Sequence, residues 1–229
     1  MTAPTAELTA LQDATDRLLT TAGALDDAAL AEPSLLPGWT RGHVLAHVSR
    51  NADALVNVLT GRPMYPSAQA READIERDAD RPLAAHLTDL RESAARLAAT
   101  TGGLTEEQWR GTVTLRNGVT DVAAAIPFRR RMEVELHHVD LDAGHTVADL
   151  PGTFTDGALD YLTRRFSGYP GLRPVEIRAE DGRSRRIGQA DGKPLVVAGS
   201  PTALVGWLAG RTTGSGLTAD GELPALPPL

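Results

Sequence analysis

The chain has 229 residues, of which 41% are hydrophobic and none is cysteine, and its formal net charge is −7. The length exceeds that of most single domains, so we expect two unequal domains. The acidic balance argues against a nucleic-acid partner, which requires a Lys/Arg surface, and the lack of cysteine excludes disulfides, thiolate metal ligands and a cysteine nucleophile.

The sequence shows no targeting or membrane segment. No apolar stretch approaches the roughly 18 residues that a membrane-spanning helix requires. The first residues lack the basic start and the apolar run of a signal peptide. We therefore expect a cytoplasmic protein without a membrane partner.

The first part of the chain has the pattern of helices. Apolar residues recur at helical spacing across residues 5–30. After a connection rich in turn residues, Thr40 is the expected N-cap of a helix that ends near Gly61. Further helices are expected over residues 67–78 and from Asp80, as N-cap, to Gly102. Residues 105–108 match a capping box and predict a brief helical turn.

A hairpin and a fourth long helix complete the expected bundle. Asn117 and Gly118 stand between apolar residues and predict a hairpin over residues 113–119. A helix over about residues 121–142 follows. Four long helices joined by short or medium connections fit a four-helix bundle.

The pattern changes after Gly144. A helix is expected over residues 155–166, followed by short strands over residues 174–179, 183–187 and 195–198 and a last helix over residues 201–211. The chain is therefore predicted to be α+β, with a four-helix bundle over residues 1–148 and a small C-terminal α/β domain over residues 149–229.

Four of the six histidines lie in two short clusters on predicted helices. His43 and His47 are four residues apart and share a helix face, as do Glu133 and His137, with His138 beside them. Bundles build metal sites from side chains on facing helices. Imidazole and carboxylate ligands suit zinc, and three protein ligands leave a fourth position open. Spacing alone leaves all five residues as candidates, and ordinary surface pairs are the alternative.

Other sequence patterns favour no second catalytic chemistry. Neither the metalloprotease motif His-Glu-x-x-His nor the nucleophile elbow Gly-x-Ser-x-Gly occurs. The glycine-rich residues 210–216 follow a predicted helix and lack the lysine of a phosphate loop. The run of arginines at residues 129–131 is interpreted either as a solvated helix face or as a binding element for an anionic ligand.

Four segments, in the same order, resemble one family, the mycothiol-dependent maleylpyruvate isomerases of the DinB-like metalloprotein superfamily. The first two are residues 34–54, SLLPGWTRGHVLAHVSRNADA, and residues 63–75, PMYPSAQAREADI. The other two are residues 129–141, RRRMEVELHHVDL, and residues 207–217, WLAGRTTGSGL. The first and third resemble the metal helices of the superfamily, whereas the second and fourth resemble segments of the isomerase branch. Asp142 and Met132 depart from the family pattern, which tends to have glycine and arginine there.

The resemblance implies a DinB-like bundle and assigns roles to particular residues. It places the metal ligands on His47, Glu133 and His137 and leaves the other two histidines outside the ligand set. It implies that Arg211, from the Gly-Arg motif, is catalytic and faces the substrate. The alternative is that Arg211 only interacts with the dipole at the C-terminus of a helix. Arg71 is a second candidate for binding a substrate carboxylate, with a solvated helix residue as the alternative.

The resemblance also implies the reaction, a cis-to-trans conversion of maleylpyruvate into fumarylpyruvate on the gentisate route of aromatic degradation. A nucleophile must add to the double bond, allow rotation and leave. Because the chain has no cysteine, the thiol must come from a cofactor, which the resemblance identifies as mycothiol. A divalent metal, zinc by preference, is expected to activate that thiol.

Two other functions fit the same residues. One is a metal-dependent mycothiol S-transferase that acts on other electrophiles. The other is a non-catalytic accessory protein that binds a thiol or a metal. In each case we expect small-molecule partners and a monomer or a weak oligomer.

Overall fold

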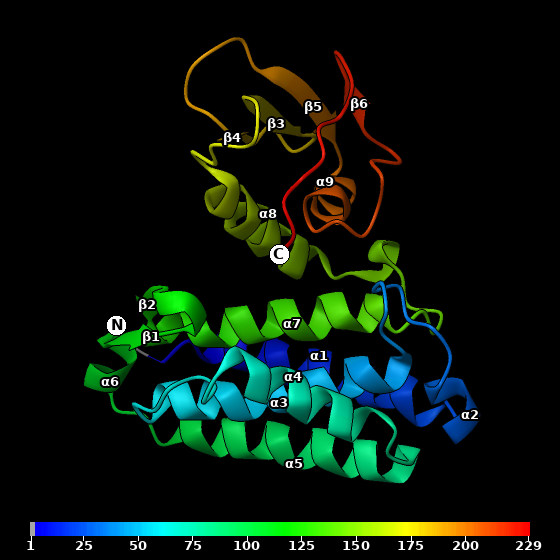
Figure 1. The fold of residues 1–229 in the computed structure, drawn as a ribbon. Coiled ribbons are helices and arrows are strands. Elements are labelled where there is room, and N and C mark those ends of the chain that lie inside the picture. The colour runs from blue at the N-terminus through cyan, green and yellow to red at the C-terminus, as the bar shows by residue number, and fades with distance from the viewer. Residues whose placement is uncertain (1–2) are drawn as a thin grey trace. The chain divides into compact units, whose positions relative to one another are not determined.

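The computed structural model describes residues 3–229, which divide after His145 into two compact units. The first unit consists mainly of helices, and the second combines helices with a four-stranded sheet (Figure 1). The predicted α+β class, a helical bundle with a small C-terminal α/β domain, is thereby confirmed.

Four long helices make up most of the first unit. They are α1 (Thr5–Gly23), α3 (Arg41–Leu59), α5 (Leu83–Gly102) and α7 (Ile126–Asp140), and the shorter helices are α2 (Asp27–Leu30), α4 (Ala68–Ala79) and α6 (Glu106–Arg110). Helix α3 packs against α4, α5 and α7, and α1 packs against α5 and α7. Their apolar faces bury a common core that includes Ala14, Leu18, Val44, Leu45, Val48, Leu90, Val134 and Leu141.

Several predicted helix boundaries are wrong. Asp80, the predicted N-cap of the helix that ends at Gly102, instead ends α4, and α5 begins at Leu83 after Pro82. The helix predicted over residues 5–30 is interrupted at residues 24–26, where the Asp26 carboxylate accepts a hydrogen bond from the backbone N–H of Ala29 at 2.8 Å and caps α2. The helix predicted over residues 121–142 begins only at Ile126. The residues before it form the strand β2 (Thr120–Val122) and a short 3-10 turn (Ala123–Ala125), and Pro127 then occupies the first turn, where proline needs no N–H partner.

The predicted hairpin is confirmed, with a longer connection than a two-residue turn. Strand β1 (Thr112–Thr114) pairs antiparallel with β2, and the 3-10 segment Arg116–Gly118 lies between them. Asn117 and Gly118 have φ angles of 59° and 73°. Both residues therefore adopt the left-handed conformation that asparagine and glycine tolerate best.

The start of α3 is fixed by a reciprocal cap. Thr40 Oγ1 accepts from the backbone N–H of His43 at 3.4 Å, and His43 Nδ1 accepts from the backbone N–H of Thr40 at 3.2 Å. The predicted N-cap at Thr40 is thus confirmed, although the residue that completes the cap is a histidine in place of the usual Glu or Gln. This cap fixes the start of α3, and His47 lies one helical turn beyond His43.

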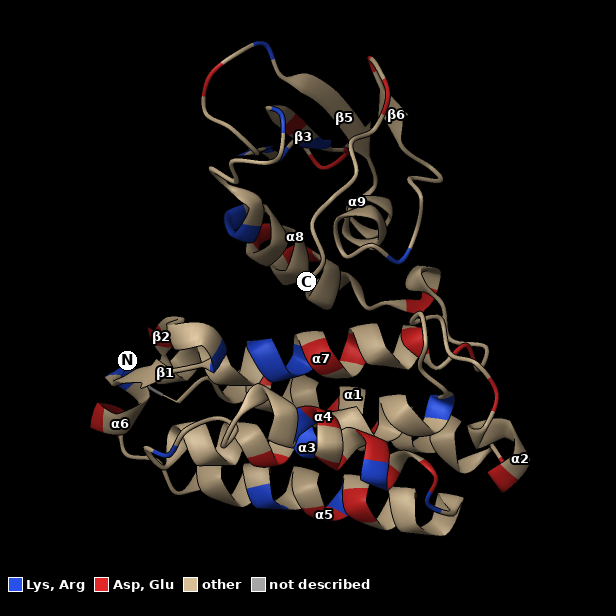
Figure 2. Ribbon diagram, in the orientation of Figure 1, with Lys and Arg blue, Asp and Glu red and all other residues tan. Residues whose placement is uncertain are grey.

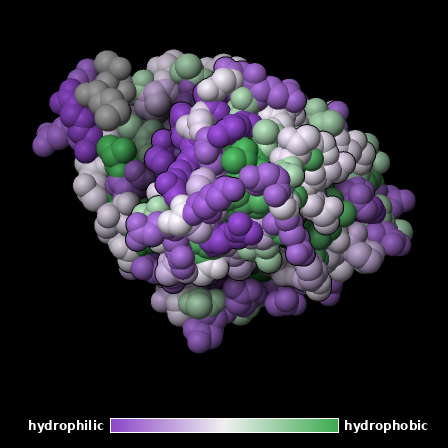
Figure 3. Space-filling model, turned by 90° about the horizontal axis from the view of Figure 1, so that it is seen from above, coloured by the Kyte–Doolittle hydropathy of each residue, from purple (hydrophilic) through white to green (hydrophobic). Residues whose placement is uncertain are grey.

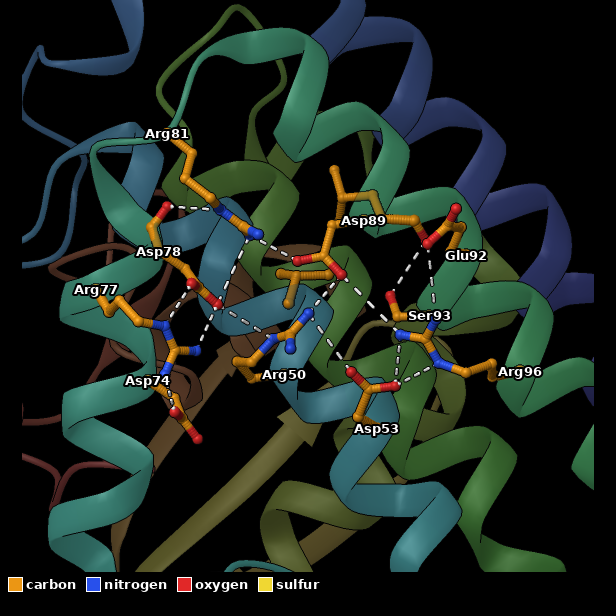
Figure 4. A network of polar contacts seen from close by, with 12 residues as sticks. Arg50, Asp53, Asp74, Arg77, Asp78, Arg81, Asp89, Glu92, Ser93 and Arg96 are labelled. Carbon is orange, nitrogen blue, oxygen red and sulfur yellow. Dashed lines mark hydrogen bonds and ion pairs between the residues drawn. The ribbon is translucent and has the colours of Figure 1, made fainter.

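A network of charged side chains joins α3, α4 and α5 (Figure 4). Arg50 of α3 pairs with Asp89 of α5, and its Nε lies 3.7 Å from Asp78 Oδ2 of α4. Arg81 Nη2 lies 2.6 Å from the other oxygen of Asp89. Asp78 is buried, so removal of its cationic partners would leave a charge without compensation. The network therefore holds α4, which carries Arg71, in a defined position on the bundle.

The second unit is a mixed sheet with two helices. The strands β3 (Val175–Ala179), β4 (Ser184–Ile187), β5 (Leu195–Gly199) and β6 (Thr218–Ala219) lie in the order β4-β3-β5-β6. Strands β3 and β5 are parallel, and the other two pairings are antiparallel. Helices α8 (Gly152–Phe166) and α9 (Pro201–Leu208) pack on each other. The sequence did not predict β6, which pairs with only two residues of β5.

One face of the protein carries both hydrophilic and hydrophobic residues (Figure 3), and α7 carries charges of both signs. The face seen in Figure 3 is mostly hydrophilic, with hydrophobic residues in small patches. Along α7 a basic segment is followed by acidic residues (Figure 2). Across residues 3–229, the structure contains no helix with the length and apolar character needed to cross a membrane.

Gly42 provides a test of the close packing between α3 and α4. A Cβ at this position would lie 2.2 Å from the carbonyl oxygen of Ala79, a backbone atom with little freedom to move. We expect Gly42→Ala to lower the free energy of unfolding by roughly 2 kcal/mol, as overpacking does, measured by urea denaturation. Gly102→Ala is the control, because no atom lies within 4 Å of the position that its new methyl group would take. Equal stability of the two variants would contradict the close approach.

Candidate metal centre

Side chains from α3 and α7 converge on one carboxylate. His47 Nε2 lies 3.0 Å from Glu133 Oε2, and His137 Nε2 lies 3.3 Å from the same oxygen. Ligand atoms of these three residues all lie within 4.8 Å of one another. The structure thus brings together the three residues that the family resemblance selected from the five candidates.

Helix geometry explains the convergence. Glu133 and His137 are one turn apart on α7 and so lie on one face, and His47 faces them from α3, which packs against α7. The rings of His47 and His137 meet edge to face with their centres 4.6 Å apart. The indole of Trp39 lies 5.4 Å from the His47 ring and adds an apolar neighbour.

The other two candidate histidines have other partners. His43 completes the cap of α3, and its Nε2 lies 3.4 Å from Glu76 Oε2. His138 Nε2 lies 2.7 Å from Thr21 Oγ1, and the ring stacks on His145 with the centres 3.7 Å apart. Neither belongs to the His47–Glu133–His137 cluster.

Burial and mutual hydrogen bonds shift the pKa values of all three side chains. Burial lowers the pKa of His47 to about 4, against the opposing effect of the Glu133 hydrogen bond. Burial also disfavours a charged His137, but hydrogen bonds to Asp140 and Glu133 outweigh it and raise the pKa of His137. Burial would raise the pKa of Glu133, yet the hydrogen bonds of both imidazoles hold it well below its usual value.

This arrangement fits a divalent cation. Glu133 is an anion that accepts from two imidazole N–H groups, so a cation at the same point would take the place of protons. Two imidazoles and one carboxylate are a ligand set found in catalytic zinc sites, in which a fourth position stays open for water or substrate. Binding of a metal would require His137 to lose its proton, so protons compete with the metal as pH falls.

Asp140 contacts the nitrogen of His137 that faces away from Glu133, a role that was not predicted from the sequence. Its Oδ2 lies 2.9 Å from His137 Nδ1, and the side chain is only 1% exposed. A carboxylate on the far nitrogen fixes the ring orientation and directs Nε2 toward a metal. The sequence signal was available, because Asp140 follows His137 by three residues on one helix and therefore lies on the same face.

Arg71 of α4 lies at the edge of the cluster. Its Nη2 is 3.1 Å from His47 Nδ1, its Nη1 is 2.6 Å from Glu72 Oε1, and its guanidinium lies 5.8 Å from the ring centre of Tyr65. A guanidinium only donates, so His47 Nδ1 accepts here and the proton of the neutral ring sits on Nε2, which faces Glu133. The alternative of a freely solvated Arg71 does not fit these contacts.

Arg211 belongs to the second unit, just beyond the end of α9. Gly210, with φ of +72°, ends the helix in the left-handed conformation, and the backbone N–H of Arg211 donates to Gly206 O at 2.8 Å. The Arg211 Nη1 donates to Ala209 O at 2.6 Å. This last contact is the one expected from a helix C-terminal arginine, while the half-buried side chain carries further contacts.

A cavity of about 750 Å³ lies at the hairpin end of the first unit. None of the three cluster residues lines it, but Tyr65, whose ring contacts Arg71, forms part of its wall. Burial raises the pKa of the Tyr65 phenol, against the opposing charge of Arg71. The other lining residues include Val58, Leu59, Met64, Leu104, Gln108, Val113 and Leu115.

Comparisons with known proteins agree over the whole chain. Residues 11–142 match the model of the mycothiol maleylpyruvate isomerase N-terminal domain, and residues 149–228 match that of the MDMPI C-terminal domain. A crystal structure of a mycothiol-dependent maleylpyruvate isomerase is similar at 30% sequence identity with a TM-score of 0.90, and both chains are covered over 100% of their length. A variant of that enzyme with one histidine replaced by alanine has a TM-score of 0.89 at the same identity and coverage. No curated protein matches the chain.

Asp140→Asn tests whether the cluster is a supported metal site. The substitution keeps the size of the side chain but removes the charge that orients His137. Zinc affinity should fall about 10- to 100-fold, as is usual when such a supporting carboxylate is lost, measured by competition with a chromophoric chelator. Asp142→Asn makes the same chemical change two residues further on, at an exposed position, and should keep wild-type affinity. Equal zinc affinity in both variants would argue against the supporting role.

Proposed function

Because this chain belongs to the mycothiol maleylpyruvate isomerase family, we propose that it is a mycothiol-dependent isomerase that converts maleylpyruvate into fumarylpyruvate. The observation that carries the proposal is the extent of the similarity. Family models span both units, and the similarity to the solved mycothiol-dependent maleylpyruvate isomerase covers the full chain.

His47, Glu133 and His137 are the proposed ligands of one divalent metal, zinc by preference. Support comes from their mutual distances, from their nitrogen and oxygen donors and from the carboxylate behind His137. When bound, such a metal supplies a Lewis acid that lowers the pKa of a thiol at its open position. His47 and His137 would bind as neutral rings, and Asp140 would keep the second of them in the required tautomer.

The nucleophile of this reaction must come from outside the chain, which has no cysteine. Mycothiol would supply a thiolate that adds to the conjugated alkene, permits rotation about the former double bond and leaves again. The remaining task of the protein is to bind the substrate carboxylates and to stabilise the enolate charge that addition creates, for which guanidinium groups are suited.

Arg71 is proposed to bind a substrate carboxylate. Coordination through His47 Nε2 would place the ring proton on Nδ1, and a protonated Nδ1 no longer accepts from Arg71. The bond of 3.1 Å between them would therefore be lost on metal binding. The guanidinium would then be available to a carboxylate while Tyr65 and Glu72 keep it near the cluster.

Reconstitution tests the proposed reaction. Metal-free protein should be inactive, and added Zn²⁺ should restore the conversion of maleylpyruvate only when mycothiol is present, with fumarylpyruvate as the product identified by NMR. Glutathione in place of mycothiol is the control for the thiol. A metal-loaded protein that leaves maleylpyruvate unchanged but conjugates mycothiol to a generic electrophile would reject the isomerase and favour an S-transferase. Tight mycothiol binding without turnover of any substrate would favour an accessory protein.

Arg211→Ala tests the proposed role of the Gly-Arg motif. If this guanidinium stabilises charge in the transition state, kcat/KM should fall by about 100-fold or more, while zinc content and Tm stay near those of the wild type. Arg164→Ala removes an exposed arginine from the last turn of α8 in the same unit and should leave turnover unchanged. Unchanged turnover in Arg211→Ala would contradict the catalytic role. Arg211 would then only cap the end of α9 through its hydrogen bond to Ala209 O.

A further inference from the structure

Arg130 of α7 is a buried cation that has only neutral hydrogen-bond partners. The residue is 2% exposed. Its Nη1 donates to the backbone carbonyl of Val48 and to Oδ1 of Asn51, each at 2.8 Å. Within residues 3–229 no carboxylate lies at ion-pair distance from this guanidinium. Burial of an unpaired charge is unfavourable, so a residue of this kind calls for a functional explanation.

The neighbouring arginines show the contrast. Arg131 is equally buried but lies 3.4 Å from Glu7 and 3.5 Å from Glu135, and Arg129 lies 2.6 Å from Asp121. The interpretation of this run as a solvated helix face is therefore wrong for its second and third members. Of the three, Arg130 is the one whose charge no carboxylate neutralises.

Its position on α7 places that charge beside the candidate metal centre. Arg130, Glu133 and His137 are separated by three and four residues, so they form one stripe along the helix. On α3, His47 meets Glu133, and Asn51, one turn further on, meets Arg130. The metal cluster and the arginine are thus consecutive layers of the same α3–α7 interface.

Electrostatics agree with this placement. Burial lowers the pKa of Arg130 to about 10, and the negative charge of Glu133 partly opposes that effect. The guanidinium therefore stays charged at neutral pH, within the electrostatic reach of the metal ligand. The other nitrogens of the fork, Nε and Nη2, make no hydrogen bond with the described residues and retain their N–H groups for a ligand.

We propose that Arg130 is the buried cation that favours an anionic ligand, a thiolate or a carboxylate, at the His47–Glu133–His137 site. The proposal rests on the isomerase function proposed above, in which both a thiolate and a dicarboxylate come to this site. A fixed positive charge attracts such ligands in a region of low dielectric constant. The same charge repels the metal ion itself.

The opposite effects of the Arg130 charge on anions and on metal ions distinguish an electrostatic role of Arg130 from a purely structural role. Neutralising Arg130 should weaken the binding of anions to the metal-loaded protein and at the same time tighten the binding of a divalent cation to the metal-free protein. A purely structural loss would weaken both. The measurements are titrations of metal-free protein with Co²⁺, and calorimetric titrations of zinc-loaded protein with maleate and, separately, with mycothiol.

Two variants remove the charge in different ways. Arg130→Gln replaces the cation with a neutral polar side chain. Asn51→Asp keeps the arginine and gives it a carboxylate at the position of the present amide oxygen, 2.8 Å from Nη1. In both we expect anion affinity to fall about tenfold, as loss of a charge-assisted bond implies, and Co²⁺ affinity to rise about threefold to tenfold. The maleate and mycothiol titrations show which anion depends more on the charge.

Two further variants act as controls. Arg130→Lys keeps the charge and should keep both affinities within about threefold. Arg129→Gln removes the adjacent, partly exposed arginine and should change neither. Circular dichroism and Tm establish that each variant is folded. If Arg130→Gln does not fold, the proposal is tested with Asn51→Asp alone.

Three results would overturn the proposal. The first is unchanged maleate and mycothiol affinity in the two charge-removing variants. The second is a parallel loss of metal and anion affinity in Arg130→Gln together with no effect of Asn51→Asp. The third is the absence of binding of either anion to the zinc-loaded wild type. Since none of these measurements uses turnover, the isomerase assay decides the proposed function independently.

Discussion

The Glu133 carboxylate accepts hydrogen bonds from imidazoles on two different helices, and the candidate centre depends on this contact. His47 reaches it from α3 at 3.0 Å and His137 from α7 at 3.3 Å. The carboxylate stays ionised despite its burial because these two donors stabilise the charge. A divalent cation can replace the two N–H groups that Glu133 accepts from. The α3–α7 contact that brings both imidazoles to Glu133 therefore also creates the candidate metal site.

The surrounding bundle serves to keep that point fixed. The Thr40–His43 cap sets the start of α3 and therefore the height of His47, while Asp140 fixes the ring of His137 from behind. The charged network of Figure 4 holds α4 against α3 and α5, which brings Arg71 to His47. Burial of a charge in the protein interior is unfavourable in free energy. Arg130 is nevertheless buried one turn from Glu133 without a carboxylate partner. The protein thus keeps positive charge where the proposed reaction brings negative charge.

Sequence patterns predicted the α+β class, the cap at Thr40 and the hairpin around Asn117, since each depends on local spacing or on backbone preferences of single residues. Spacing also marked the metal candidates, but only the family resemblance reduced five to three. The break at Asp26 and the late start at Ile126 were missed, because a side-chain cap and a strand pairing competed with helical periodicity. The environment of Arg130 was beyond prediction, as it depends on which side chains of α3 face α7. The contact between Asp140 and His137 could have been predicted, because the two residues are three apart on one helix.

His47, Glu133 and His137 are proposed to bind one divalent metal and to leave a position open for a thiol. Electronic absorption of the Co²⁺-loaded protein tests this proposal most directly, because a thiolate that binds cobalt adds a charge-transfer band in the near ultraviolet. We expect one Co²⁺ per chain and a new band when mycothiol is added, and we expect neither in His47→Ala. Stoichiometric Co²⁺ binding that persists in His47→Ala, or a spectrum that mycothiol leaves unchanged, would contradict the proposal.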